Sequence, residues 1–115
     1  MGDSLAGAAI LVLTQMPDRG SAQALARALL EARLAACVSV GAPVESLYHW
    51  HGRIETADEV TVAIKTVAGR YVELEAAIRA RHPYELPEII AVSITDGLAP
   101  YLDWIAAETD ASKPG

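Results

Sequence analysis

Histidine and cysteine are the side chains that most often bind transition metals, and this chain of 115 residues has three histidines and one cysteine. His49 and His51 lie two residues apart, so on a β-strand they project from one face, where such a pair can bind zinc or nickel. The same spacing also occurs on solvated strand faces and at subunit interfaces. The pair therefore leaves two alternatives open, a pair of metal ligands or a strand face without a metal.

Cys37, the single cysteine, excludes a disulfide or a four-thiolate zinc site within one chain and is typical of a reducing compartment. It lies in a short apolar segment without a basic neighbour in the sequence. Because a reactive thiol needs an electropositive and exposed setting, we expect Cys37 to be a small buried hydrophobe of the core.

Catalytic residues are not recognisable in this sequence. Nucleophilic catalysis needs a nucleophile beside a base, and the sequence places no such pair together. The Gly-x-Gly-x-x-Gly and Walker motifs of nucleotide-binding loops are absent, so nucleotide binding has no support. We therefore expect a protein that is not an enzyme.

Charge and hydropathy limit the partners further. Fifteen acidic and nine basic residues give a formal net charge of −6, which argues against nucleic acid, because a phosphate backbone requires a basic face. The apolar segments are too short to span a bilayer and no signal peptide is recognisable, so we expect a cytoplasmic protein without a membrane partner. The length suits a single domain over 1–115, with an ordered core at about 8–108.

The elements that must position these side chains follow from the hydrophobic pattern. It predicts strands at 8–13, 36–51, 53–66 and 89–94, with an interruption of the second strand at Gly41-Ala42-Pro43. The strands at 8–13 and 89–94 are apolar at nearly every position, which is typical of strands buried on both faces. Helices are predicted from the N-cap Ser21 to Ala32, at 68–81 and from Pro100 onward.

This order of elements is the split βαβ pattern of an α+β fold. We therefore predict a ferredoxin-like βαββαβ sandwich with a long hairpin and an extra C-terminal helix. The ribbon from 44 to 66 is longer than so small a domain can cover, and Tyr48 and Trp50 share one of its faces. Large aromatic side chains on such a ribbon more often fill a subunit interface than bind a ligand, so we expect both at an interface between subunits.

Three stretches of the chain resemble the CutA family of divalent-cation tolerance proteins, and the resemblance covers about residues 8–106. It implies a ferredoxin-like subunit that forms a homotrimer through its long hairpins, similar in design to the PII signalling proteins. It also implies a connection with tolerance to copper and other divalent metals. The motifs that carry it are Val12-Leu13-Thr14-Gln15-Met16-Pro17-Asp18 with Leu34-Ala35-Ala36-Cys37-Val38, Ser46-Leu47-Tyr48-His49-Trp50-His51-Gly52-Arg53-Ile54-Glu55 with Lys65-Thr66, and His82-Pro83-Tyr84-Glu85-Leu86-Pro87-Glu88.

Copper-binding bacterial members of this family resemble the chain with a cysteine at the position of Thr14 and two adjacent histidines at those of Arg81 and His82. Thiolate and imidazole favour copper, whereas the Arg81 cation would repel it, so we expect weaker copper binding here. His82 and Glu88 remain the candidate ligands of a divalent metal ion, Cu²⁺ or Zn²⁺, with Asp18 as a harder ligand. The alternative is that His82 caps the preceding helix.

Two hypotheses of function follow from the resemblance. The first is a cytoplasmic homotrimer connected with divalent-metal tolerance, which acts by binding metal or by responding to metal ions. The alternative is a PII-like sensing module, which binds a small anion in the clefts between subunits and acts through a partner protein.

Overall fold

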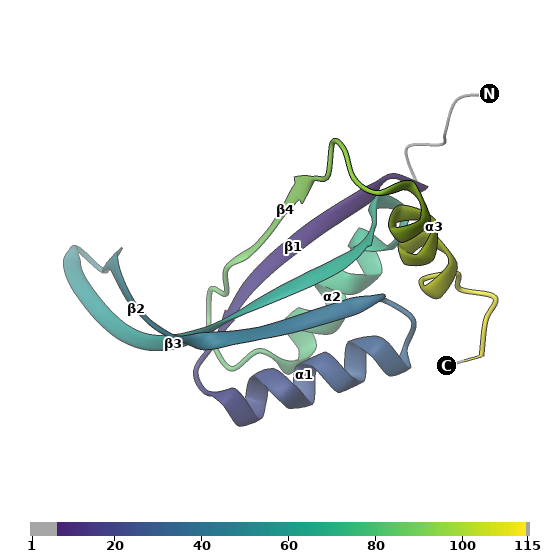
Figure 1. The fold of residues 1–115 in the computed structure, drawn as a ribbon. Coiled ribbons are helices and arrows are strands. Elements are labelled where there is room, and N and C mark those ends of the chain that lie inside the picture. The colour runs from purple at the N-terminus through teal and green to yellow at the C-terminus, as the bar shows by residue number, and fades with distance from the viewer. Residues whose placement is uncertain (1–6, 115) are drawn as a thin grey trace.

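The computed structural model describes residues 7–114, and its elements follow the predicted order (Figure 1). Residues 1–6 and 115 of the predicted domain lie outside the described residues. A short 3₁₀ turn, η2 (Ala68–Arg70), occupies the predicted start of the second helix. The strands are β1 (Ala9–Met16), β2 (Cys37–Trp50), β3 (Arg53–Val67) and β4 (Ile89–Ser93), and the α-helices are α1 (Arg19–Glu31), α2 (Tyr71–Arg81) and α3 (Ala99–Glu108).

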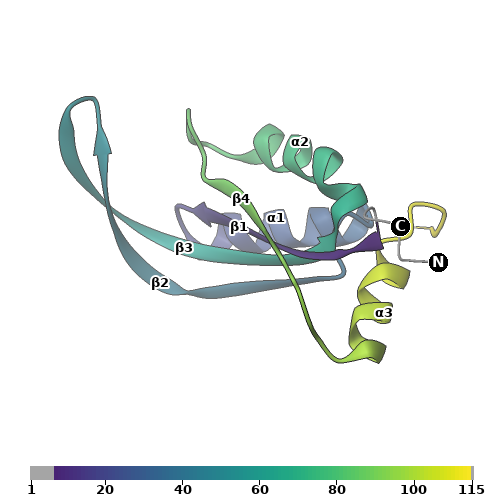
Figure 2. The same ribbon diagram turned by 90° about the horizontal axis from the view of Figure 1, so that it is seen from above.

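The strands form a four-stranded antiparallel sheet in the order β2-β3-β1-β4. The two βαβ halves, β1-α1-β2 and β3-α2-β4, interleave so that β1 and β3 lie in the centre. Helices α1 and α2 cover one face of the sheet, and α3 lies on the other side at one end (Figure 2). This arrangement confirms the predicted ferredoxin-like α+β sandwich with its additional C-terminal helix.

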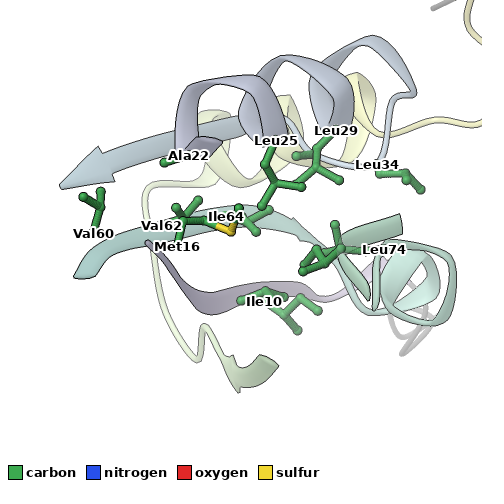
Figure 3. Close-up of a cluster of buried hydrophobic side chains, with 13 residues drawn as sticks. Ile10, Met16, Ala22, Leu25, Leu29, Leu34, Val60, Val62, Ile64 and Leu74 are labelled. Carbon is green, nitrogen blue, oxygen red and sulfur yellow. The ribbon is translucent and has the colours of Figure 1, made fainter. Parts of the chain in front are cut away.

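The core lies between the sheet and the two covering helices (Figure 3). Alternate residues of β1 and β3 point toward α1 and α2, because successive side chains of a strand project to opposite faces. Complete burial of an aliphatic side chain stabilises a fold by about 1.5–3 kcal/mol. The fully buried apolar residues of these elements include Val12, Val62, Ile64, Leu74 and Ile78.

Strands β1 and β4 are less buried than their sequences predict. Strand β1 is fully buried on the helix-facing side only, and β4 is an edge strand in which Ile90 and Val92 remain 49% and 48% exposed. The expectation that both strands are buried on both faces is therefore wrong for a single chain. The physical reason is that no helix of the described residues covers the middle of the second face of the sheet, which we call the open face.

The start of α1 and the hairpin turn also differ from the prediction. The N-cap of α1 is Asp18, whose side chain accepts a hydrogen bond of 2.7 Å from the backbone N–H of Ser21. Strand β2 ends at Trp50, and His51 lies in the turn with a φ of 51°, followed by Gly52 with a φ of 76°. His51 therefore does not share a strand face with His49, and the predicted His-x-His arrangement is wrong.

The β2–β3 hairpin extends well beyond the body of the subunit. Its register shifts between Val40 and Pro43, at the predicted interruption, and β1 pairs with β3 only as far as Val60. Residues 44–59, which we call the arm, consequently pair only with each other and curve away from the sheet (Figures 1 and 2). Apolar side chains are left uncovered on it, since Leu47 is 64% and Ile54 72% exposed.

Candidate functional site

A cavity of about 620 Å³ lies between the arm and the segment that joins α2 to β4. We call this connecting segment, residues 82–88, the strap. The cavity thus brings together residues of all three sequence motifs, which lie far apart in the chain. Four elements form its walls. They contribute Gln15 from β1, Ser46, Leu47, Tyr48, His49 and Trp50 from β2, Glu59 from β3, and Tyr84, Glu85, Leu86 and Glu88 from the strap.

The strap has an extended start because its sequence prevents α2 from continuing. Pro83 disfavours the helical conformation for the residue before it, and His82 accordingly has φ −82° and ψ 132°. The Nε2 atom of His82 lies 2.7 Å from the carbonyl oxygen of Gln15, and the backbone N–H of Tyr84 donates to Nδ1 over 3.2 Å. These two hydrogen bonds connect the strap to β1.

The two partners of His82 define its proton arrangement. A carbonyl oxygen can only accept and an amide N–H can only donate, so Nε2 carries the hydrogen and Nδ1 presents the lone pair. Both nitrogens of the ring are therefore occupied by the backbone, and a metal ion could bind His82 only after one of these hydrogen bonds breaks. The role of His82 as a metal ligand stays a prediction.

The other residues of the predicted metal site do not converge on one point. Glu88 lines the cavity, whereas Thr14 is fully buried on the helix-facing side of β1 and Arg81 is exposed at the end of α2. The hydroxyl of Thr14 has no hydrogen-bond partner among the described residues. Within residues 7–114 no three His, Cys, Asp or Glu side chains lie close enough to hold a metal ion. A metal bound by His82 or Glu88 would need further ligands from water or another copy of the chain.

Glu59 is the residue of the site that the sequence did not single out. Its side chain lies at the inner end of the arm, in register with Val44, and the residue is only 8% exposed. The sequence signal was present but weak: a charged residue directly before the buried run that begins with Val60. None of the described Lys, Arg or His side chains forms an ion pair with Glu59.

The electrostatic effect of Glu59 is visible at Tyr84. Burial raises the pKa of Tyr84 to about 12, with further contributions from a hydrogen bond to Glu59 and from its negative charge. The negative charges of ionised Tyr48 and of Asp18 act in the same direction. The cavity is thus an acidic environment, and no Lys or Arg of the described chain lines it.

Aromatic rings form a further part of the wall. Tyr48 and Trp50 lie on the arm, and Tyr84 lies on the strap. The Trp50 ring is also in edge contact with His51 at a centroid distance of 4.7 Å. Both residues predicted at a subunit interface therefore line the cavity, and their place at an interface stays a prediction.

Fold and site together define a class of subunit: a ferredoxin-like sandwich with an extended arm and an acidic, aromatic cavity beside it. Residues 10–108 match the sequence profile of the CutA1 divalent ion tolerance protein family. The chain belongs to this family, as its motifs predicted.

Relatives in bacteria and vertebrates are similar over most of this chain. A divalent-cation tolerance protein CutA from Thermus thermophilus is 37% identical over 99 residues, which cover 86% of this chain and 96% of that protein. The human protein CutA is 40% identical over 95 residues, which cover 83% of this chain and 53% of that protein.

Solved structures show the same fold. CutA from Xylella fastidiosa has a TM-score of 0.86 at 42% identity and covers 89% of this chain and 98% of its own. CutA1 from Oryza sativa has a TM-score of 0.89 at 33% identity, with 95% and 100% covered. A structure from Archaeoglobus fulgidus, with a TM-score of 0.86 at 34% identity over 89% of this chain and 99% of its own, is described as a periplasmic divalent cation tolerance protein. Among the described residues no helix is long and apolar enough to cross a membrane, and the cytoplasmic location stays a prediction.

Proposed function

We propose that this protein contributes to tolerance of divalent cations as a homotrimer and without catalysing a reaction. The observation that carries the proposal is the family match over residues 10–108, with relatives that are named divalent-cation tolerance proteins. The proposed location is the cytoplasm, as the single free cysteine favours.

Uncovered apolar surface supports the homotrimer. On the open face, Leu13 of β1 lies between Ala63 of β3 and Ile90 of β4. In the neighbouring row, Leu11 lies beside Val92 of β4. Exposed apolar patches of this kind mark association sites, and the arm supplies a second such surface. Packing these surfaces against further copies of the chain would remove them from water.

The donor atoms support a response to metal ions that does not depend on a preformed copper site. Both ring nitrogens of His82 are engaged with the backbone, and Arg81 beside it carries a positive charge. Weak contacts of a divalent ion with Glu88 and the other cavity carboxylates remain the available mode of binding, because oxygen ligands suit harder cations.

A growth assay tests the tolerance role. A bacterial strain that lacks its own CutA gene is complemented with the wild-type chain and grown on increasing Cu²⁺ and Zn²⁺. We expect the wild type to restore tolerance, and His82→Ala to retain most of it because His82 is not required as a direct ligand. A wild-type chain that is expressed and folded yet restores no tolerance to any divalent ion contradicts the proposal.

A PII-like sensing role is the second candidate, and one observation favours it. The 620 Å³ cavity is large enough for a small organic molecule and lies beside an arm whose surface is free to contact partners. Its acidic lining argues for a ligand other than the small anion that the resemblance to PII proteins first suggests. Ligand-dependent changes in binding of a partner protein would test this role.

A further inference from the structure

We propose that the cavity between arm and strap binds an organic cation, an alkylammonium or alkylguanidinium group held against the Glu59 carboxylate. This proposal names a class of ligand for the sensing role, and its biological meaning rests on that role. The binding itself can be tested without it. It does not depend on metal tolerance. Four observations support it: the low exposure of Glu59, the negative charge of the cavity, the placement of its aromatic rings and its size.

Burial of Glu59 is the first step. The residue is 92% removed from solvent, since only 8% remains exposed, and no described cation pairs with it. Its side chain lines the cavity, and a carboxylate in such a partly enclosed site attracts a positive group more strongly than a carboxylate in open water does. A ligand cation in the cavity would supply the positive partner that Glu59 lacks within the described residues.

The aromatic rings favour the same ligand class. Tyr48, Trp50 and Tyr84 line the cavity from two sides, the arm and the strap. The face of an aromatic ring attracts an ammonium or guanidinium group and also packs against an alkyl chain. Leu47 and Leu86 extend this apolar wall, so a cation with a short hydrocarbon stem would meet both charge and apolar surface.

Size and charge exclude the competing ligand classes. Glu59, Glu85 and Glu88 all line the cavity, yet residues 7–114 contain no three such side chains within the reach of one metal ion. The carboxylates are therefore too dispersed to hold one metal ion together and offer it only weak contacts, whereas their spread suits a larger cation. An anion would meet three carboxylates and no described Lys or Arg, which makes its binding unfavourable.

The cation can come from either of two sources. One is a free small molecule, and the other is a basic side chain of a second copy. Arg53 fits the second source, because it is exposed at the tip of the arm and forms no ion pair within the described residues. The chemistry at Glu59 is the same in both cases, so the experiment must separate them.

Calorimetric titration of the native protein with three ligands of similar shape provides the test. The probes are n-butylguanidinium, the neutral n-butylurea and the anion butyrate. We expect binding of n-butylguanidinium alone, and loss of affinity of at least about tenfold in Glu59→Gln, which removes the charge but keeps the shape. The matched control is Asp58→Asn, an exposed carboxylate on the same strand outside the cavity, which should change affinity less than about threefold.

The variant Arg53→Ala separates the two sources. If wild type binds n-butylguanidinium, the site takes a free cation; if only Arg53→Ala binds it, Arg53 of a second copy fills the cavity in the native assembly. Should Glu59→Gln fail to fold, the three-ligand comparison on these two proteins decides alone.

The inference is overturned if neither wild type nor Arg53→Ala binds n-butylguanidinium, if n-butylurea binds equally well, or if folded Glu59→Gln binds unchanged. The metal growth assay is a separate readout. If the wild-type chain restores no metal tolerance but binds n-butylguanidinium, the tolerance proposal alone is refuted. If it restores tolerance but neither it nor Arg53→Ala binds n-butylguanidinium, this inference alone is refuted.

Discussion

His82 holds the strap against the sheet through Gln15, because its Nε2 atom lies 2.7 Å from the Gln15 carbonyl oxygen. The other ring nitrogen accepts a hydrogen bond from the backbone N–H of Tyr84. The imidazole thus bridges the backbone of Gln15 and that of Tyr84, which are far apart in the sequence. The ring thereby sets the position of Tyr84 and of the cavity wall that follows it.

Removal of this bridge should weaken the fold. In His82→Ala the partly buried carbonyl of Gln15 and the N–H of Tyr84 lose their partner, and the loss of such hydrogen bonds costs about 1–2 kcal/mol. We expect the free energy of unfolding in urea to fall by about that amount. The control is His49→Ala, an exposed arm residue, where a change within about 0.5 kcal/mol is expected. Equal effects of the two substitutions would show that the bridge contributes nothing.

Copper binding should be weak in the wild-type protein. Thr14, which stands where we expect copper-binding relatives to carry a cysteine, is fully buried, and Arg81 places a cation beside His82. Titration with Cu²⁺ should therefore show much lower affinity than in a family member with the cysteine and both histidines. Tight, stoichiometric binding that disappears in His82→Ala would contradict this expectation.

The sandwich could be predicted from the sequence because hydrophobic periodicity reports which face of each strand meets the helices. The exposed edge of β4 could not, because an apolar run such as Ile89-Ile90-Ala91-Val92 looks the same whether its second face is covered by a helix or left for another chain. The burial of β4 that the sequence predicts is thus absent from one chain.

The cavity was only partly predictable. Tyr48, Trp50 and Glu88 were candidates because their residue types stand out in the motifs, but Glu59 and Gln15 are recognisable only once the arm bends beside the strap. The error at His51 has a similar origin, since residue spacing does not tell which residue adopts the positive φ of the turn.

Stability should decrease at alkaline pH through Tyr84. Its pKa is raised from 10.0 to about 12 in the folded chain, so the folded state keeps the phenol proton where the unfolded state has lost it. The stabilising contribution is complete below pH 10.0 and disappears as the pH rises through about 12. Urea unfolding across this range should show a steeper loss in wild type than in Tyr84→Phe. Identical slopes would mean that Tyr84 titrates normally.

Cys37 should react slowly in the native protein. It is half-buried at the start of β2, in register with Lys65 on the open face, so the expectation that it is a buried residue of the core is wrong. If the open face is covered by other copies, a thiol reagent should modify Cys37 slowly in the assembly and faster when the assembly dissociates. Native labelling as fast as in denaturant would show that neither the fold nor an assembly protects the thiol.

The assembly itself is the most consequential prediction, because it determines what covers the arm. The arm pairs only with itself and exposes Leu47, Tyr48 and Ile54, an apolar surface that a monomer would leave in water. Burial of a large aromatic side chain contributes on the order of 2–3 kcal/mol, and a closed ring of identical subunits repeats this gain at every interface. The native mass in solution should therefore be three times 12.2 kDa.

Trp50→Ala tests whether the arm makes this assembly. Truncation of the indole removes the largest side chain of the arm, so the trimer fraction and the melting temperature should fall together, the latter by several degrees. Val72→Ala is the matched control, because Val72 is an exposed apolar residue on α2, away from the arm. It should leave both quantities unchanged. Light scattering that reports a stable wild-type monomer at micromolar concentration would refute the trimer, and the exposed arm would then need a different partner.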